Sequence, residues 1–144
     1  MNIRTLYVVT LAFLLGACAT PMSTTLPDSA KRGHLSTLMV NLSSAVDGYF
    51  ADLPQAPTDP DDVILKKATE HDPSLLAPEF SRYEVKTQYQ NPFAVLLLCT
   101  KDGKQAIMED AGCSARLDRK VTRPAECKFT LRVKEGCVVE GGEQ

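Results

Sequence analysis

The sequence contains no tryptophan, only two histidines and no apolar run of membrane-spanning length. So few aromatic rings and imidazoles give no basis for a base-stacking platform or a His-rich metal site. The glycine-rich loop that holds phosphates and the Gly-x-Ser-x-Gly turn of many hydrolases are also missing. A formal net charge of −2 excludes a general nucleic-acid binder on charge alone. We therefore expect a non-enzymatic protein with no metal, cofactor, nucleic acid or small-molecule substrate.

The first 17 residues have the three parts of a secretory signal peptide. Arg4 provides a basic start, residues 6–15 form an apolar run broken only by Thr10, and small residues follow. A membrane-spanning helix needs about 20 apolar residues, so this run is too short to be one. The sequence therefore predicts that residues 1–17 are removed during export.

The end of this segment, Leu15-Gly16-Ala17-Cys18, resembles the lipobox of bacterial lipoproteins. The resemblance implies cleavage before Cys18, a diacylglycerol on its thiol and a further acyl chain, such as palmitate, on its amine. Stable anchoring needs more than one acyl chain, and such a cysteine carries enough hydrocarbon. Ala19 stands where Asp favours retention at the inner membrane in such proteins, so the resemblance implies the periplasmic face of the outer membrane. The inner membrane is one alternative, and an ordinary secretory signal that happens to contain a cysteine is another.

Four cysteines remain after Cys18, and an even number in an exported chain predicts two disulfides. Three connectivities are open. Sequential pairing, Cys99–Cys113 with Cys127–Cys137, is favoured because it would close short loops. A four-thiolate zinc site is the competing interpretation, but the spacings of 14, 14 and 10 residues lack the close Cys-x₂₋₄-Cys pairs of such sites. The four cysteines are Cys99, Cys113, Cys127 and Cys137.

Removal of 17 residues from 144 leaves 127, which is the length of one domain. Residues 18–33 are small, polar and proline-containing, which is typical of a lipidated N-terminus with a flexible tether. Residues 34–140 are expected to form a single domain, and residues 141–144 a loose C-terminus.

Helical periodicity comes first in the predicted domain. Apolar residues recur at spacings of three and four from about 34 to 53, where Pro54 ends the pattern. A short second helix is expected over residues 63–69, with Asp59 as its N-cap and Pro60 at its first helical position.

A period of two follows, which is typical of strands. Strands are expected at 82–90, 93–98, 104–108 and 128–133. Asn91-Pro92 and Asp102-Gly103 mark turns between them. The segment 109–126 is loop-like with a short element near 114–120, and residues 137–140 are expected to pair back on the last strand. The predicted fold is α+β, with N-terminal amphipathic helices packed on a small antiparallel sheet of about four strands.

Two groups of acidic residues are candidate sites. Glu109 and Asp110 are neighbours, so in a strand they point to opposite faces and do not form an acid–base pair. They are expected at a solvated strand end. Asp59, Asp61 and Asp62 are explained by the start of a helix, because the glycine and distal Glu of an EF-hand loop are missing.

Basic residues concentrate late in the chain. Residues 111–134 contain seven basic and two acidic residues, whereas residues 19–80 contain four basic and nine acidic ones. Such asymmetry can steer a charged partner, although an ordinary charged surface also explains it. The candidate partner-binding residues are Arg116, Arg119, Lys120 and Arg123.

These observations favour an accessory role at the membrane. The leading hypothesis is a non-enzymatic binding subunit of an envelope, secretion or conjugation assembly. It would contact a protein partner in the envelope through a sheet edge or the basic region. The alternative is a periplasmic inhibitor of a cell-wall hydrolase of the lysozyme type, because disulfide-tied loops are preorganised for binding in a cleft.

Overall fold

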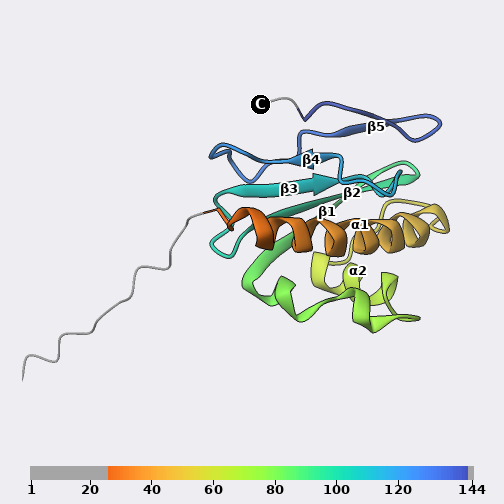
Figure 1. Ribbon diagram of the computed structural model, residues 1–144. Helices are drawn as coiled ribbons and strands as arrows, with labels where there is room; N and C mark the ends of the chain where they lie inside the picture. The colour runs from red at the N-terminus through yellow and green to blue at the C-terminus, as the bar shows by residue number, and fades with distance from the viewer. Residues whose placement is uncertain (1–25, 143–144) are drawn as a thin grey trace, which may run out of the picture.

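The computed structural model describes residues 26–142, which form an α+β fold (Figure 1). Four strands make one antiparallel sheet in the order β1-β2-β3-β4, and two short strands make a second sheet. None of the helices in this range is long and apolar enough to cross a membrane. The elements are α1 Ser29–Ala51, α2 Asp61–Ala68, the 3₁₀ helices η1 Pro73–Leu75 and η2 Pro78–Arg82, and the strands β1 Tyr83–Gln90, β2 Phe93–Thr100, β3 Ala106–Asp110, β4 Arg119–Lys120, β5 Arg132–Lys134 and β6 Val138–Glu140.

Helix α1 begins at Ser29, five residues earlier than the periodicity predicts. The Asp28 side chain accepts a hydrogen bond from the Lys31 amide at 2.9 Å, which caps the helix. The assignment of residues 29–33 to a tether is therefore wrong, because these residues form the first turn of α1. The predicted apolar stripe is confirmed as the buried face of α1, and its fully or almost fully buried members are Leu35, Met39, Leu42, Val46 and Phe50.

Helix α2 starts at Asp61, and Pro60 rather than Asp59 occupies the N-cap position. Asp59 instead accepts a hydrogen bond from Lys67 Nζ at 2.7 Å. Asp61 and Asp62 lie in the first turn as predicted, where negative charge is favourable.

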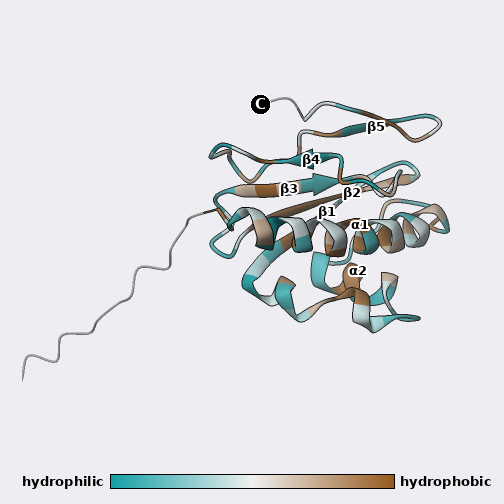
Figure 2. Ribbon diagram, in the orientation of Figure 1, coloured by the Kyte–Doolittle hydropathy of each residue, from teal (hydrophilic) through white to brown (hydrophobic). Residues whose placement is uncertain are grey.

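Strand β2 is the centre of the fold and is covered on both faces, as its apolar sequence predicts. Ala94, Leu96 and Leu98 belong to the cluster that packs under α1. Val95 and Leu97 point to the opposite face and join the clusters of the C-terminal segment. Figure 2 shows the hydrophobic colour concentrated in β2 and the first part of β3. The turns at Asn91-Pro92 and Asp102-Gly103 are confirmed, with Gly103 at a φ of 68°.

The predicted long strand at 128–133 is wrong. Only Arg132–Lys134 is a strand, and it pairs with Val138–Glu140, so the expected return pairing is confirmed. Residues 130 and 131 do not join a ladder because their amides donate to the Glu109 carboxylate, at 2.8 and 2.9 Å. The short element expected near 114–120 corresponds to β4.

The cysteines form two disulfides, Cys99–Cys127 and Cys113–Cys137. Sequential pairing is therefore wrong. Cys99 lies opposite Ala106 at the start of β3, whereas Cys113 follows the end of that strand. The four steps from Ala106 to Asp110 along β3 span about 13 Å, whereas the Cα atoms of a disulfide lie within about 7 Å of each other.

Candidate functional site

The residues that follow β4 lie over the sheet face opposite α1, and we name residues 121–142 the C-terminal cover. Its apolar side chains, including Val121 and Leu131, pack against Leu97 and Val95 of β2. Strand β5, near the C-terminal end of the cover, lies on the opposite side of the molecule from α2 (Figure 1). The sheet is therefore enclosed between helices and a disulfide-tied segment.

Glu109 joins the cover to the sheet from inside the protein. Its side chain is 0% exposed, and it accepts hydrogen bonds from Arg119 Nη1 at 3.1 Å and from the Thr130 hydroxyl at 2.8 Å. The Thr130 and Leu131 amides donate to its other oxygen. The prediction of a solvated strand end is wrong here, because β4 and the cover exclude water from this side chain. Because both of its oxygens accept hydrogen bonds from within the protein, the Glu109 carboxylate has a structural role.

Asp110 is also buried, on the opposite face of the sheet, as the strand geometry predicts. It bonds to the Ser43 hydroxyl of α1 and accepts from the amides of Asp118 at 3.0 Å and Gly112 at 3.2 Å. Burial raises the pKa of the Asp110 carboxyl, and the hydrogen bond with Ser43 opposes this rise. The expectation of a solvated strand end is therefore wrong for both carboxylates.

Ser43 links the Asp110 carboxyl to helix α1. The Ser43 hydroxyl has one proton but two acceptor neighbours, the Val40 carbonyl at 3.0 Å and an Asp110 oxygen. This arrangement ties β3 to the middle of α1.

The four candidate cations do not share one surface. Arg119 is 5% exposed and paired with Glu109, so its predicted role as an exposed contact is wrong. Arg116, Lys120 and Arg123 are exposed. Lys120 lies opposite Met108 in the β3–β4 register and Arg119 opposite Glu109, so these neighbours point to opposite faces of the sheet.

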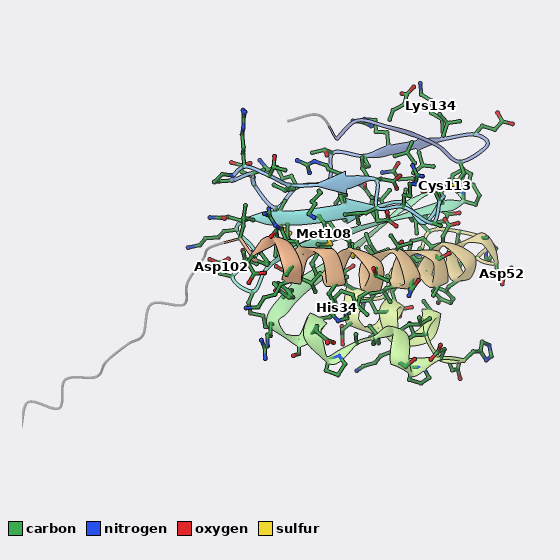
Figure 3. All side chains as sticks on the ribbon, in the orientation of Figure 1. His34, Asp52, Asp102, Met108, Cys113 and Lys134 are labelled. Atoms are coloured by element: carbon green, nitrogen blue, oxygen red, sulfur yellow. A yellow bond between two sulfur atoms is a disulfide. The ribbon has the colours of Figure 1, made fainter. Side chains whose placement is uncertain are left out.

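Other cations of the cover are partly compensated by neighbouring acids. Lys128 forms an ion pair with Glu126, and Lys134, labelled at the edge of the cover in Figure 3, binds Glu140 at 2.6 Å. These exposed pairs reduce the local excess of positive charge that the sequence indicates.

Cys18, the predicted lipidation site, lies outside the described residues, as do the signal segment and residues 19–25 of the predicted tether. Both histidines are exposed. His34 Nε2 lies 3.4 Å from Glu79 Oε1 on the side of α1 that faces η2 (Figure 3).

Two grooves flank η2. The first, which we name the edge groove, has a volume of ≈ 600 Å³ and lies between β1, η2 and the start of α2. The second, of ≈ 690 Å³, lies between η2 and the first turns of α1. The sequence indicates a sheet edge as a contact surface but not these grooves, because they depend on how η2 packs against β1.

No three His, Cys, Asp or Glu side chains within residues 26–142 are placed to hold a metal ion. Comparisons with protein-family models, curated proteins and solved structures found no match for this chain.

Proposed function

We propose that this chain is an acylated envelope lipoprotein, anchored through Cys18, whose domain binds a protein partner without catalysing a reaction. The observation that carries the proposal is the use of the five cysteines. Four of them pair in two disulfides, which form in oxidising compartments such as the periplasm. The fifth is the cysteine of the lipobox-like Leu15-Gly16-Ala17-Cys18.

A binding role is supported by how the domain uses its buried polar groups. The carboxylates of Glu109 and Asp110 are both engaged in hydrogen bonds within the fold. The exposed cations Arg116, Lys120 and Arg123 and the edge groove remain as surfaces for a partner. On this proposal the helices follow the tether directly and the domain stands close to the membrane.

The outer membrane, on its periplasmic side, is the proposed location. Ala19 rather than Asp follows the acylated cysteine, which in lipoproteins of this type favours transfer away from the inner membrane.

The anchor is tested by growing cells that express the protein with labelled palmitate and then separating their membranes. We predict that the wild-type chain carries the label in the outer-membrane fraction, and that Cys18→Ala abolishes both labelling and membrane association. The matched control removes the outer pair of cysteines, Cys113→Ala with Cys137→Ala, and should keep the label. Ala19→Asp should move the labelled protein to the inner-membrane fraction. Unchanged processing and membrane association in Cys18→Ala would overturn the proposal.

A further inference from the structure

Within residues 26–142, no strand pairs with the outer edge of β1. In an antiparallel strand, backbone groups point alternately toward the neighbouring strand and away from it. The Thr87 amide donates to Asp61 Oδ1 at 2.9 Å, so odd-numbered residues of β1 point away from β2. The Thr100 and Ala94 amides, which lie opposite Tyr83 and Tyr89, point away from β1 and confirm this phase. The amide and carbonyl of Val85 therefore face outward.

The free edge is short because its ends are occupied. Asp61 holds both the amide and the hydroxyl of Thr87, the latter at 2.7 Å. At the other end the Tyr83 amide donates to Phe80, which begins the strand directly after η2. Val85 offers its amide and carbonyl to an added strand. The Tyr83 carbonyl accepts a long hydrogen bond from the exposed Lys101 Nζ at 3.5 Å, which an added strand would have to replace.

The edge groove lies beside these backbone groups. Leu65, Leu76 and Phe80 give it an apolar wall, and Val85 belongs to its lining. A strand added at this edge would direct alternate side chains toward that wall and away from it. The groove therefore has room for an apolar side chain next to the paired backbone.

The rim of the groove is acidic. Asp61 and Asp62 line it on the α2 side, and Glu84 lies on β1 beside Val85 with its side chain on the opposite face of the strand. Lys101 is the single basic residue of the lining. Lys66 and Lys86 form only long, exposed pairs with Asp62 and Glu84, at 4.0 and 3.7 Å. Such pairs contribute little and are easily exchanged for other cations.

We propose that the edge groove binds an extended segment of a partner protein, which adds as a short strand to β1 and carries apolar side chains alternating with Lys or Arg. This proposal rests on the binding role proposed above and names the kind of partner. Main-chain hydrogen bonds to Val85 supply affinity, the apolar wall takes one side chain, and the acidic rim selects positive charge.

The test uses the full lipidated protein in detergent micelles and labelled nine-residue peptides. The probe alternates Val with Lys. A second peptide alternates Val with Glu, and a third keeps the Lys residues but replaces the central Val with Pro, which removes a backbone donor. Fluorescence anisotropy should show binding of the first peptide only.

Two further readouts locate the binding. Combined Asp62→Lys and Glu84→Lys should weaken binding about tenfold, because two favourable rim charges become repulsive. The matched control Asp52→Lys reverses an exposed charge at the far end of α1 (Figure 3) and should leave binding unchanged. The exchange of the Val85 amide with solvent should slow about tenfold on binding, since it gains a hydrogen-bond partner.

Binding without a change in Val85 exchange, or equal loss in the Asp52→Lys control, would show non-specific charge attraction and overturn the proposal. Equal binding of the Val–Glu peptide would do the same. These outcomes leave the palmitate labelling of Cys18 untouched, so failure here and failure of the lipoprotein assignment are distinguishable.

Discussion

The buried ion pair between Glu109 and Arg119 depends on a contact that the sequence around Arg119 does not indicate. Arg119 is one of seven basic residues in its region, and in the sequence nothing separates it from Arg116 or Arg123. Its role depends on β4, a strand of only two residues that places it opposite Glu109. A pattern of period two cannot be recognised over two residues, so the buried pair was not predictable.

We predict that Arg119→Met lowers the free energy of unfolding by about 3–5 kcal/mol, because it leaves the buried Glu109 carboxylate without its cation. Urea denaturation followed by circular dichroism measures the change. The control Arg123→Met removes an exposed cation of the same region and should change stability by less than about 0.5 kcal/mol. Equal effects of the two substitutions would show that the buried pair contributes nothing specific.

Asp110 gives a second prediction at the residue scale, on pH. Burial raises its pKa above the unfolded value of 3.8, so between these two values the folded state binds more protons than the unfolded state. The stability that Asp110 contributes is therefore fully present below pH 3.8 and is lost as pH rises through the folded pKa. We predict that Asp110→Asn removes this loss. The stability of the variant relative to wild type should therefore increase as pH rises from 3.8 through the folded pKa of Asp110. Thermal unfolding at a series of pH values measures the difference.

Two features make the Asp110 measurement specific. The nearby acidic residues are Asp118, in the loop before β4, and Asp47 on α1, whose Cβ lies close to the Gly112 turn, and both remain in the variant. Asp102→Asn is the control with the opposite sign. The Thr100 hydroxyl lowers the pKa of Asp102, so its contribution is present above pH 3.8 and lost as pH falls. A relative stability of Asp110→Asn that does not vary with pH would contradict the prediction.

At the scale of elements, prediction succeeded where one face of an element sets the pattern. The stripe from Leu35 to Phe50 repeats at helical spacing because one side of α1 packs on the sheet. The apolar run of β2 reflects burial on both faces, and the turn signals at 91–92 and 102–103 fix its two hairpins. These features determine the α+β fold.

Prediction failed where side chains rather than a ladder hold the backbone. Residues 128–131 alternate like a strand, but the Thr130 and Leu131 amides bond to Glu109. Gln90 acts similarly, since its side-chain amide donates to the Leu131 carbonyl at 3.0 Å and accepts from the Val133 amide at 2.8 Å. These contacts join residues more than 20 positions apart, which local periodicity does not register.

At the scale of the whole molecule, the C-terminal cover makes the fold a closed layer structure. Gly141 and Gly142, which the sequence places in a loose end, both have positive φ and pack closely within the protein, Gly141 against Thr130 and Gly142 against Leu131 and Arg119, so the prediction is wrong for these two residues. A Cβ on Gly141 would lie 2.4 Å from the Thr130 carbonyl oxygen, so this close approach requires glycine. The predicted hairpin at 102–103 places Cys99 at one end of the following strand and Cys113 beyond its other end, so the turn and the strand length argue against sequential pairing.

The two disulfides fix the cover to the sheet at different depths, which gives a last prediction. Their sequence separations, 28 and 24 residues, are similar. Each disulfide should therefore stabilise the fold by about 3 kcal/mol through its restriction of the unfolded chain. Cys99 is 0% exposed in the central strand, whereas Cys113 and Cys137 are partly exposed. Replacing both members of a pair by Ala should therefore cost more at Cys99–Cys127, where the lost sulfur atoms leave a cavity beside Leu97 and Val121.

Urea denaturation of the two double variants measures this difference. The Cys113→Ala, Cys137→Ala variant should lose mainly the entropic contribution, together with faster amide exchange in β5 and β6, since an isolated two-stranded hairpin is marginal in water. The Cys99→Ala, Cys127→Ala variant should lose that amount and the cavity contribution in addition. Equal or larger destabilisation on removal of the outer bridge would mean that the C-terminal hairpin, rather than the buried centre of the sheet, depends most on cross-linking.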